Sequence, residues 1–126
     1  MKTVIATREA PAAIGPYSQA TSTGTLIFTS GQLPIDPATG MFPEGGVGEQ
    51  TRQSLKNIAA ILREKGGDMD NVVKTTVFLQ DMNDFSAMNE VYSSFFTSGT
   101  YPARSAIEIA RLPKDALVEI EAVAVL

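Results

Sequence analysis

Apolar side chains recur at helical spacing in residues 49–65. The positions that share one face of such a helix are Thr51, Leu55, Ile58 and Leu62. The charged Arg52 and Lys56 fall on the wetter side. Glu49 suits the first turn of a helix, and the Gly66-Gly67 pair provides a stop. The pattern predicts an amphipathic helix over 49–65 whose apolar face packs against a core.

A second helix is expected over residues 86–96, where Asp84 or Ser86 could cap the N-terminus. Its apolar stripe consists of Phe85, Met88, Tyr92 and Phe95. Bulky stripes of this kind usually belong to a core, and we predict that role for this one.

Four segments have the β-branched or alternating composition of strands. They are residues 25–29, 72–79, 103–110 and 117–125. In the first third of the chain, prolines and glycines separate short apolar runs, which predicts further short strands joined by turns. Residues 35–48 are predicted as a loop, and residues 112–115 as the turn between the last two strands.

The last predicted strand alternates between an apolar face and a face that carries Glu119 and Glu121. In residues 103–110, one face carries Arg104, Ala106 and Glu108. Two helices can cover only one side of such a sheet, which predicts an open α+β fold. The uncovered side is mixed in polarity, and another copy of the chain is the simplest cover for it.

At 126 residues the chain is expected to form one domain, residues 1–126. Its hydrophobic fraction of 44% is that of an ordinary globular protein. The net charge is -4 and the 10 basic residues are scattered, so a nucleic-acid partner is not expected. No secretion signal or membrane-spanning segment is recognisable, so a cytoplasmic location is expected.

Three residue types are absent from the chain: Cys, His and Trp. Without cysteine there can be no disulfide, thiolate catalysis or cysteine-bound zinc. Without histidine the commonest general base and metal ligand is missing. Any catalysis must therefore rest on carboxylates, Lys, Arg, Tyr, hydroxyl or amide side chains, backbone groups and water.

Arg104 and Glu119 are the charged residues with the clearest chemical potential. Arg104 follows Tyr101-Pro102-Ala103, and a guanidinium can hold a carboxylate through two parallel hydrogen bonds. An ion pair with Glu108 or Glu121 is the alternative. Glu119 alternates with apolar residues, where a carboxylate can order a water molecule and exchange protons with it. A solvated or cross-strand charge is its alternative. Weaker candidates, each also explained by packing, a turn or a cap, are Tyr17, Ser30 and Asn89.

Six motifs, in order along the whole chain, resemble those of the reactive intermediate deaminase A (RidA) family. They are Ala10–Gln19 (APAAIGPYSQ), Ser30–Pro34 (SGQLP), Val73–Phe78 (VKTTVF), Asn89–Tyr92 (NEVY), Pro102–Asp115 (PARSAIEIARLPKD) and Glu119–Ala122 (EIEA). The resemblance implies a chorismate-mutase-like fold, a single layer of mixed β-sheet with two helices on one face. It also implies a homotrimer with sites in the clefts between subunits.

Members of that family hydrolyse enamines of the 2-aminoacrylate type, or the tautomeric 2-imino acids, to 2-keto acids and ammonia. The resemblance therefore implies a small 2-imino or enamino acid as the substrate. It implies no metal and no organic cofactor. An iminium carbon is already strongly electrophilic, so positioning of substrate and water with modest proton transfer can suffice for its hydrolysis.

The same resemblance assigns roles to individual residues. Arg104 corresponds to the arginine that binds the substrate carboxylate, and Glu119 to the glutamate that orients water. The positions that match the substrate-binding cleft are Tyr17, Ser30, Gly31, Asn89 and Ala106. Many relatives have cysteine at the last of these, so Ala106 excludes a thiol there but leaves a backbone N–H that can bind substrate.

Two other functions stay open at this point. Some relatives have been described as endoribonucleases or translation inhibitors, which would make RNA the substrate. A non-catalytic trimer that binds small keto acids would also use Arg104.

Overall fold

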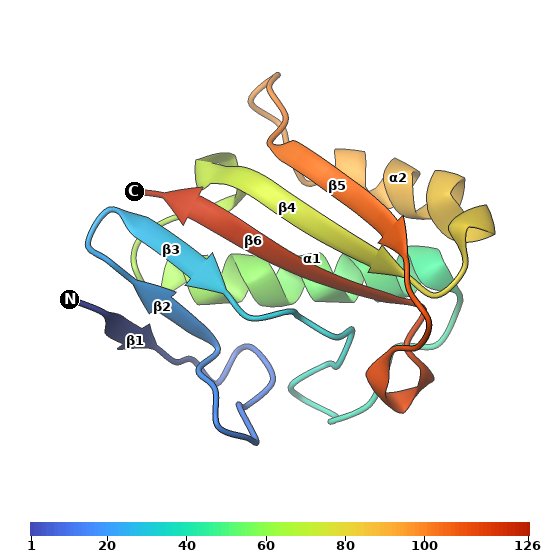
Figure 1. The fold of residues 1–126 in the computed structure, drawn as a ribbon, viewed down its shortest axis with the longest axis horizontal. Coiled ribbons are helices and arrows are strands. Elements are labelled where there is room, and N and C mark those ends of the chain that lie inside the picture. Colours follow the sequence, from blue (N-terminus) through green and yellow to red (C-terminus); the bar gives the residue numbers. More distant parts are fainter.

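A computed structural model describes all residues, 1–126, as one six-stranded sheet with two α-helices (Figure 1). The strands are β1 (Thr3–Ile5), β2 (Ala20–Ser22), β3 (Leu26–Thr29), β4 (Val72–Leu79), β5 (Ala103–Glu108) and β6 (Val118–Val125). The helices are α1 (Val47–Arg63) and α2 (Phe85–Ser93). Short 3₁₀ turns occur at Met69–Asn71, Met82–Asp84 and Pro113–Asp115.

The strand order in the sheet is β1-β2-β3-β6-β4-β5. The pair β4–β5 is parallel and is connected through α2, whereas the other neighbouring strands run antiparallel. The C-terminal strand β6 lies between β3 and β4, so the sheet is mixed. The predicted α+β class with a mixed sheet is confirmed.

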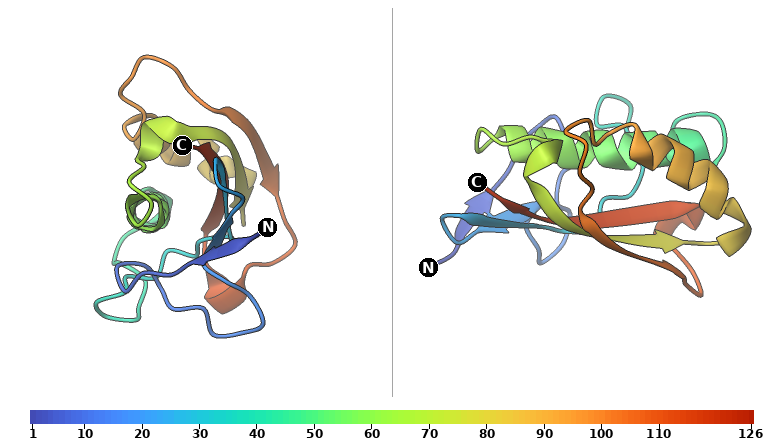
Figure 2. Two further views of the ribbon diagram at one scale, coloured as in Figure 1. Left: turned by 90° about the vertical axis from the view of Figure 1, so that its left-hand side faces the viewer. Right: turned by 90° about the horizontal axis from the view of Figure 1, so that it is seen from above.

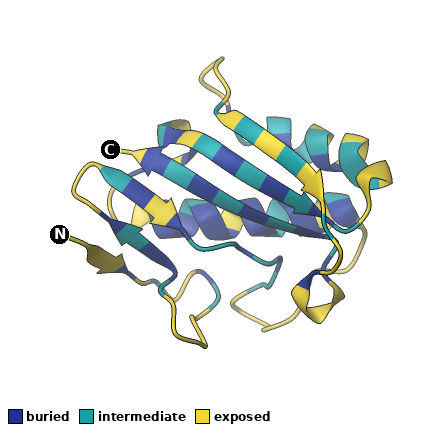
Figure 3. Cartoon of the chain, in the orientation of Figure 1, coloured by how far each residue is buried: buried dark blue, intermediate teal, exposed yellow.

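Both helices cover the same face of the sheet, as the view from above shows (Figure 2). The hydrophobic core, a cluster of 21 buried residues, includes side chains of α1, α2 and the covered face of the sheet. Strand β6 displays the alternation that the sequence predicts (Figure 3). Its core-facing residues are Val118, Ile120, Ala122 and Ala124. Glu119 and Glu121 are half-buried on the opposite, open face.

Helix α1 has the predicted apolar face, since Thr51, Leu55, Ile58 and Leu62 are each 0% exposed. It begins at Val47, two residues earlier than predicted, and ends at Arg63. Gly66 has a φ of +76°, and the Gly67 amide donates to the Leu62 carbonyl at 3.0 Å. This is the 6→1 bond of a Schellman motif, so the glycine stop is confirmed.

Helix α2 ends at Ser93, three residues before the predicted end at residue 96. The Ser93 and Ser94 hydroxyls donate to the carbonyls of Glu90 and Val91, and the amides that follow make i→i−3 bonds. Local bonds of this kind compete with continuation of a helix. Asp84 occupies the expected N-cap position of α2, but its side chain accepts no capping bond, while Asp81 caps the preceding 3₁₀ turn by accepting from the Asn83 amide at 2.9 Å.

The predicted strands agree with the structure to within two residues, the largest difference being the end of β5 at Glu108. The turn after it contains Lys114 and Asp115 in left-handed backbone conformations, with φ of 58° and 57°. No helix combines the length and the apolar character needed to cross a bilayer.

Candidate active site

Arg104 lies on the edge strand β5, with its side chain directed toward α2. Its Nη1 donates to Asn89 Oδ1 at 2.7 Å. Its guanidinium carbon is 4.7 Å from the Tyr92 ring centroid and 5.3 Å from that of Phe85. We call Arg104, Asn89, Tyr92 and Phe85 the Arg104 half-site. Rings at these distances attract the cation through their π faces.

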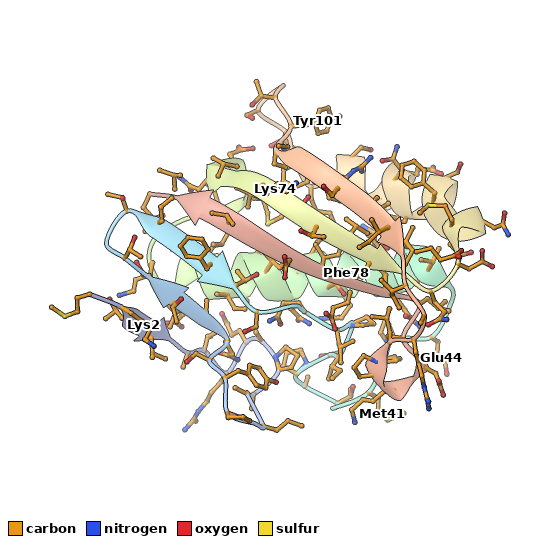
Figure 4. The ribbon with its side chains drawn as sticks, in the orientation of Figure 1. Lys2, Met41, Glu44, Lys74, Phe78 and Tyr101 are labelled. Carbon is orange, nitrogen blue, oxygen red and sulfur yellow. The ribbon has the colours of Figure 1, made fainter.

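A cavity of about 430 Å³ adjoins this half-site. It is lined by Asn89, Tyr92, Ser93, Tyr101, Pro102 and Arg104. Tyr101 lies in the loop before β5 and is 64% exposed (Figure 4). The cavity is therefore lined by both an exposed aromatic residue and Arg104.

The positive charge of Arg104 has no acidic partner within the chain. The single salt bridge joins Arg63 to Glu9 at 3.7 Å. Glu108, one of the two partners considered for an alternative ion pair, instead accepts from the Met82 amide at 2.8 Å. Burial raises the pKa of Tyr92, although its hydrogen bond to Thr75 and the charge of Arg104 act in the opposite direction. A neutral Tyr92 leaves the guanidinium charge uncompensated.

Glu119 lies on the open face of the sheet, against the backbone of Gly31. A Cβ added to Gly31 would lie 2.4 Å from Glu119 Oε2, so a larger residue at this position would displace the carboxylate. Partial burial raises the pKa of Glu119, and the charge of Glu121 raises it further. The pKa of a carboxylate shifts upward in this way because both effects disfavour its ionised form.

Ser30 lies next to this carboxylate, whereas Tyr17 lines a different cavity, of about 500 Å³, together with residues of β1. Ser30 precedes Gly31, and its hydroxyl donates to the Ser18 carbonyl at 2.6 Å. That bond ties the end of β3 to the segment that carries Tyr17, a residue 51% exposed. We call Glu119, Gly31 and Ser30 the Glu119 half-site.

The two half-sites face opposite sides of the sheet. Arg104 lies opposite Thr75 of β4, and Thr75 lies opposite Ala122 of β6. Thr75 and Ala122 are buried on the face that the helices cover, so Arg104 belongs to that face. Glu119 lies opposite Phe78 of β4, and Phe78 lies opposite Ile107 of β5. All three residues therefore belong to the open face.

Directly opposed residues of neighbouring strands share a face, so Arg104 and Glu119 cannot meet within one chain. Phe78, with Lys74 on the same strand, is visible on the open face in Figure 4.

Ala106 shares its strand face with Arg104 and packs against the core. The Ile109 amide donates to the Leu79 carbonyl of β4 at 2.9 Å. Because backbone groups alternate in direction along a strand, the Ala106 N–H points away from β4, toward the free edge of the sheet.

No group of three or more acidic, histidine or cysteine side chains is arranged to hold a metal ion.

Tyr92 and Phe85 were predicted only as core residues, and their contact with Arg104 is an addition from the structure. A signal for it exists in the sequence. Phe85, Asn89 and Tyr92 are spaced by four and three residues, which places them on one side of α2.

These features define a class: a small α+β protein with an uncompensated arginine beside a cavity on one sheet face and a carboxylate on the other. The model of the family described as "Endoribonuclease L-PSP" matches residues 7–126, and the chain belongs to that family. The resemblance to RidA proteins is confirmed by the relatives that follow.

The 2-iminobutanoate/2-iminopropanoate deaminase of Escherichia coli K12 is 53% identical, over 99% of this chain and 98% of its own. A Yersinia pestis structure described as a member of the conserved Rid protein family has a TM-score of 0.96 at 48% identity, covering 100% of both chains. The structure of E. coli TdcF with bound serine has a TM-score of 0.94 at 48% identity, covering 98% of each chain.

Proposed function

We propose that this protein is an enzyme that hydrolyses the C=N bond of small 2-imino acids, or their enamine tautomers, to 2-keto acids and ammonia. The observation that carries the proposal is the uncompensated guanidinium of Arg104 beside a cavity of about 430 Å³. A half-buried arginine without an acidic partner in its own chain favours an anionic ligand, and a 2-imino acid has a carboxylate. The named activity of the E. coli relative supports this substrate class.

The complete site, in this proposal, forms between copies of the chain in a homotrimer. One copy supplies the Arg104 half-site, and its neighbour supplies the Glu119 half-site. The opposite facing of the two half-sites supports an intersubunit arrangement. So does the open face of the sheet, where Phe28 is 43% and Ile107 is 44% exposed, because apolar patches of this kind commonly mark interfaces.

In the proposed mechanism, Arg104 binds the substrate carboxylate through donors that Asn89 does not use. The outward N–H of Ala106 adds a further donor at the strand edge. Tyr17, Ser30 and Gly31 line the other side of the cleft. Glu119 accepts a proton from water as the water oxygen bonds to the imine carbon, and it returns that proton to the imine nitrogen. The hydroxyl proton of the resulting carbinolamine then passes to the nitrogen, the C–N bond breaks, and the 2-keto acid and ammonia are released.

The raised pKa of Glu119 suits this role. A general base works best when its pKa approaches the working pH, because it is then both ionised and basic. Partial burial and the neighbouring Glu121 both move the pKa of Glu119 in that direction. A protein without histidine can thus obtain a proton acceptor from a carboxylate.

Cleavage of RNA is the second candidate, because the description of the matching family is "Endoribonuclease L-PSP". The net charge of -4 weighs against binding a polyanion. RNA cleavage by the wild-type protein that disappears in Arg104→Ala would favour it.

A complementation experiment tests the proposal. Arg104→Ala and Glu119→Gln should each lose most of the activity toward imine generated in situ, with kcat of the second lowered at least about 10²-fold. If half-sites from different copies combine, random mixing of the two variants restores about a quarter of the sites, each with an intact arginine and an intact glutamate.

Native mass spectrometry verifies exchange of chains and the trimer mass. The control mixture pairs Arg104→Ala with the double variant Arg104→Ala/Glu119→Gln, and it stays inactive. Exchange without recovered turnover in the first mixture contradicts a shared site, and absence of turnover in the wild type contradicts the activity.

A further inference from the structure

Three side chains of α2 hold the Arg104 guanidinium from different directions. Tyr92 and Phe85 present ring faces to it, at 4.7 Å and 5.3 Å from its carbon. Asn89 accepts a hydrogen bond from Nη1 at 2.7 Å. An arginine side chain has several rotatable bonds, so a lone arginine would sample many orientations of its donor edge. The ring contacts and the amide restrict that freedom before any ligand arrives.

Tyr92 is itself held from behind, on the side of the core. Its hydroxyl and the Thr75 hydroxyl form a hydrogen bond of 2.6 Å. Thr75 is 0% and Tyr92 is 3% exposed, so neither hydroxyl can exchange this bond for water. The Tyr92 ring also packs against Phe96, with centroids 4.9 Å apart. The bond therefore joins β4 to the ring that faces Arg104.

We propose that Thr75 and Tyr92 are positioning residues that set the orientation in which Arg104 receives the substrate carboxylate. This inference rests on the proposed function. In this scheme both residues act through the orientation of Arg104 and not on the reacting atoms of the substrate. Their hydrogen bond holds the ring, and the ring holds the plane of the guanidinium. Preorganisation of this kind raises affinity because less freedom is lost on binding.

The proposal predicts an effect on binding more than on the chemical step. In this scheme Arg104 holds the carboxylate equally in the ground state and the transition state, so a misoriented guanidinium raises KM and leaves kcat nearly unchanged. Thr75→Val replaces the hydroxyl with a methyl group of similar size, and we expect KM for 2-iminopropanoate to rise about tenfold. Tyr92→Phe keeps the ring, removes the other half of the bond and should have a similar effect.

The double variant Thr75→Val/Tyr92→Phe separates positioning from stability. Each single variant leaves one buried hydroxyl without a partner, which lowers the melting temperature. The double variant removes both hydroxyls, so most of the stability returns. Its ring still lacks the bond that orients it, and KM therefore stays raised.

Two further variants serve as controls. Thr75→Ser retains a hydroxyl and should keep KM near the wild-type value. Thr51→Val removes another fully buried hydroxyl, one that has no hydrogen-bond partner, and should change neither KM nor k_cat.

The measurements are KM and k_cat with imine generated in situ, the melting temperature, and the Kd of pyruvate, used as a carboxylate probe. A tenfold rise of both KM and Kd in Thr75→Val and in the double variant supports the proposal. Wild-type KM and Kd in variants with a lowered melting temperature overturn it and leave the pair with a structural role only. Failure of the proposed function looks different, since the wild type itself would then release no ammonia from the imine.

Discussion

Replacing Gly31 with alanine should displace the Glu119 carboxylate while leaving the fold intact. The added Cβ would lie 2.4 Å from Oε2 and 2.8 Å from Cδ of Glu119. Ordinary contact requires roughly 3.5 Å, so the carboxylate must move by about 1 Å. A displacement of about 1 Å in a catalytic site can cost about 10²-fold in rate. We expect k_cat for imine hydrolysis to fall by about that factor.

Thermal stability should change little in Gly31→Ala. Gly31 does not have a left-handed φ, so its backbone accepts an alanine. The group that must move is the end of a flexible, half-buried side chain. Gly46→Ala is a matched control, because no atom lies within 4 Å of its added Cβ and its φ of -98° suits alanine.

Turnover and thermal melting are measured for Gly31→Ala and Gly46→Ala. Only the first variant should lose turnover, and both should keep the wild-type melting temperature. In a Glu119→Gln background, Gly31→Ala should cause little further loss, since both changes disable the same group. A kcat near the wild-type value in Gly31→Ala would refute this reasoning. So would a further decrease of kcat by about 10²-fold when Gly31→Ala is added to Glu119→Gln.

Two more predictions concern the charges. Arg104→Lys should lose about two powers of ten in kcat/KM with an almost unchanged melting temperature, because lysine cannot form the planar bidentate pair. Turnover close to that of the wild type would exclude the bidentate clamp. The acid limb of kcat/KM should lie above the usual pKa of a glutamate, because Glu119 must be ionised to accept a proton and its pKa is raised. Glu121→Gln removes one of the two causes that raise the pKa of Glu119, so the acid limb of the pH–rate profile should move to lower pH. An acid limb that does not move would mean that Glu119 is not the base.

The elements with strong local periodicity were predictable from the sequence. Helix α1 places Leu55, Ile58 and Leu62 at 0% exposure, because three apolar residues per two turns dictate which face is buried. The C-terminal end of α2 could not be predicted from periodicity. Phe95 continues the apolar stripe, but the helix ends two residues earlier, where the Ser93 and Ser94 hydroxyls bond to backbone carbonyls. Local hydrogen bonds determine the helix boundary in that segment, and the hydrophobic pattern carries no information about them.

The site was predictable as a set of residues but not as an arrangement. Arg104 and Glu119 stand out in the sequence as charged residues among apolar positions. Which side chains contact them depends on how strands distant in the sequence pair in the sheet, and the local pattern does not determine that pairing. Tyr92 has the spacing of a core residue and is indeed 3% exposed, while its ring also contacts Arg104. That second role depends on β5 lying beside β4 with Thr75 opposite Arg104, a register that tertiary packing determines.

The alternation of strand residues links the proposed chemistry to assembly. Arg104 is opposite Thr75 and Glu119 is opposite Phe78, two positions of β4 that differ by three residues and therefore lie on opposite faces. A shift of one residue in either pairing would bring both charges to the same face. In the present register, the open face that displays Glu119 also displays exposed apolar side chains such as Ile107. Burying that face against another copy and completing a site with the copy's Arg104 would then be one event. In the proposed mechanism, dilution that separates the copies should therefore abolish turnover while each chain keeps its fold.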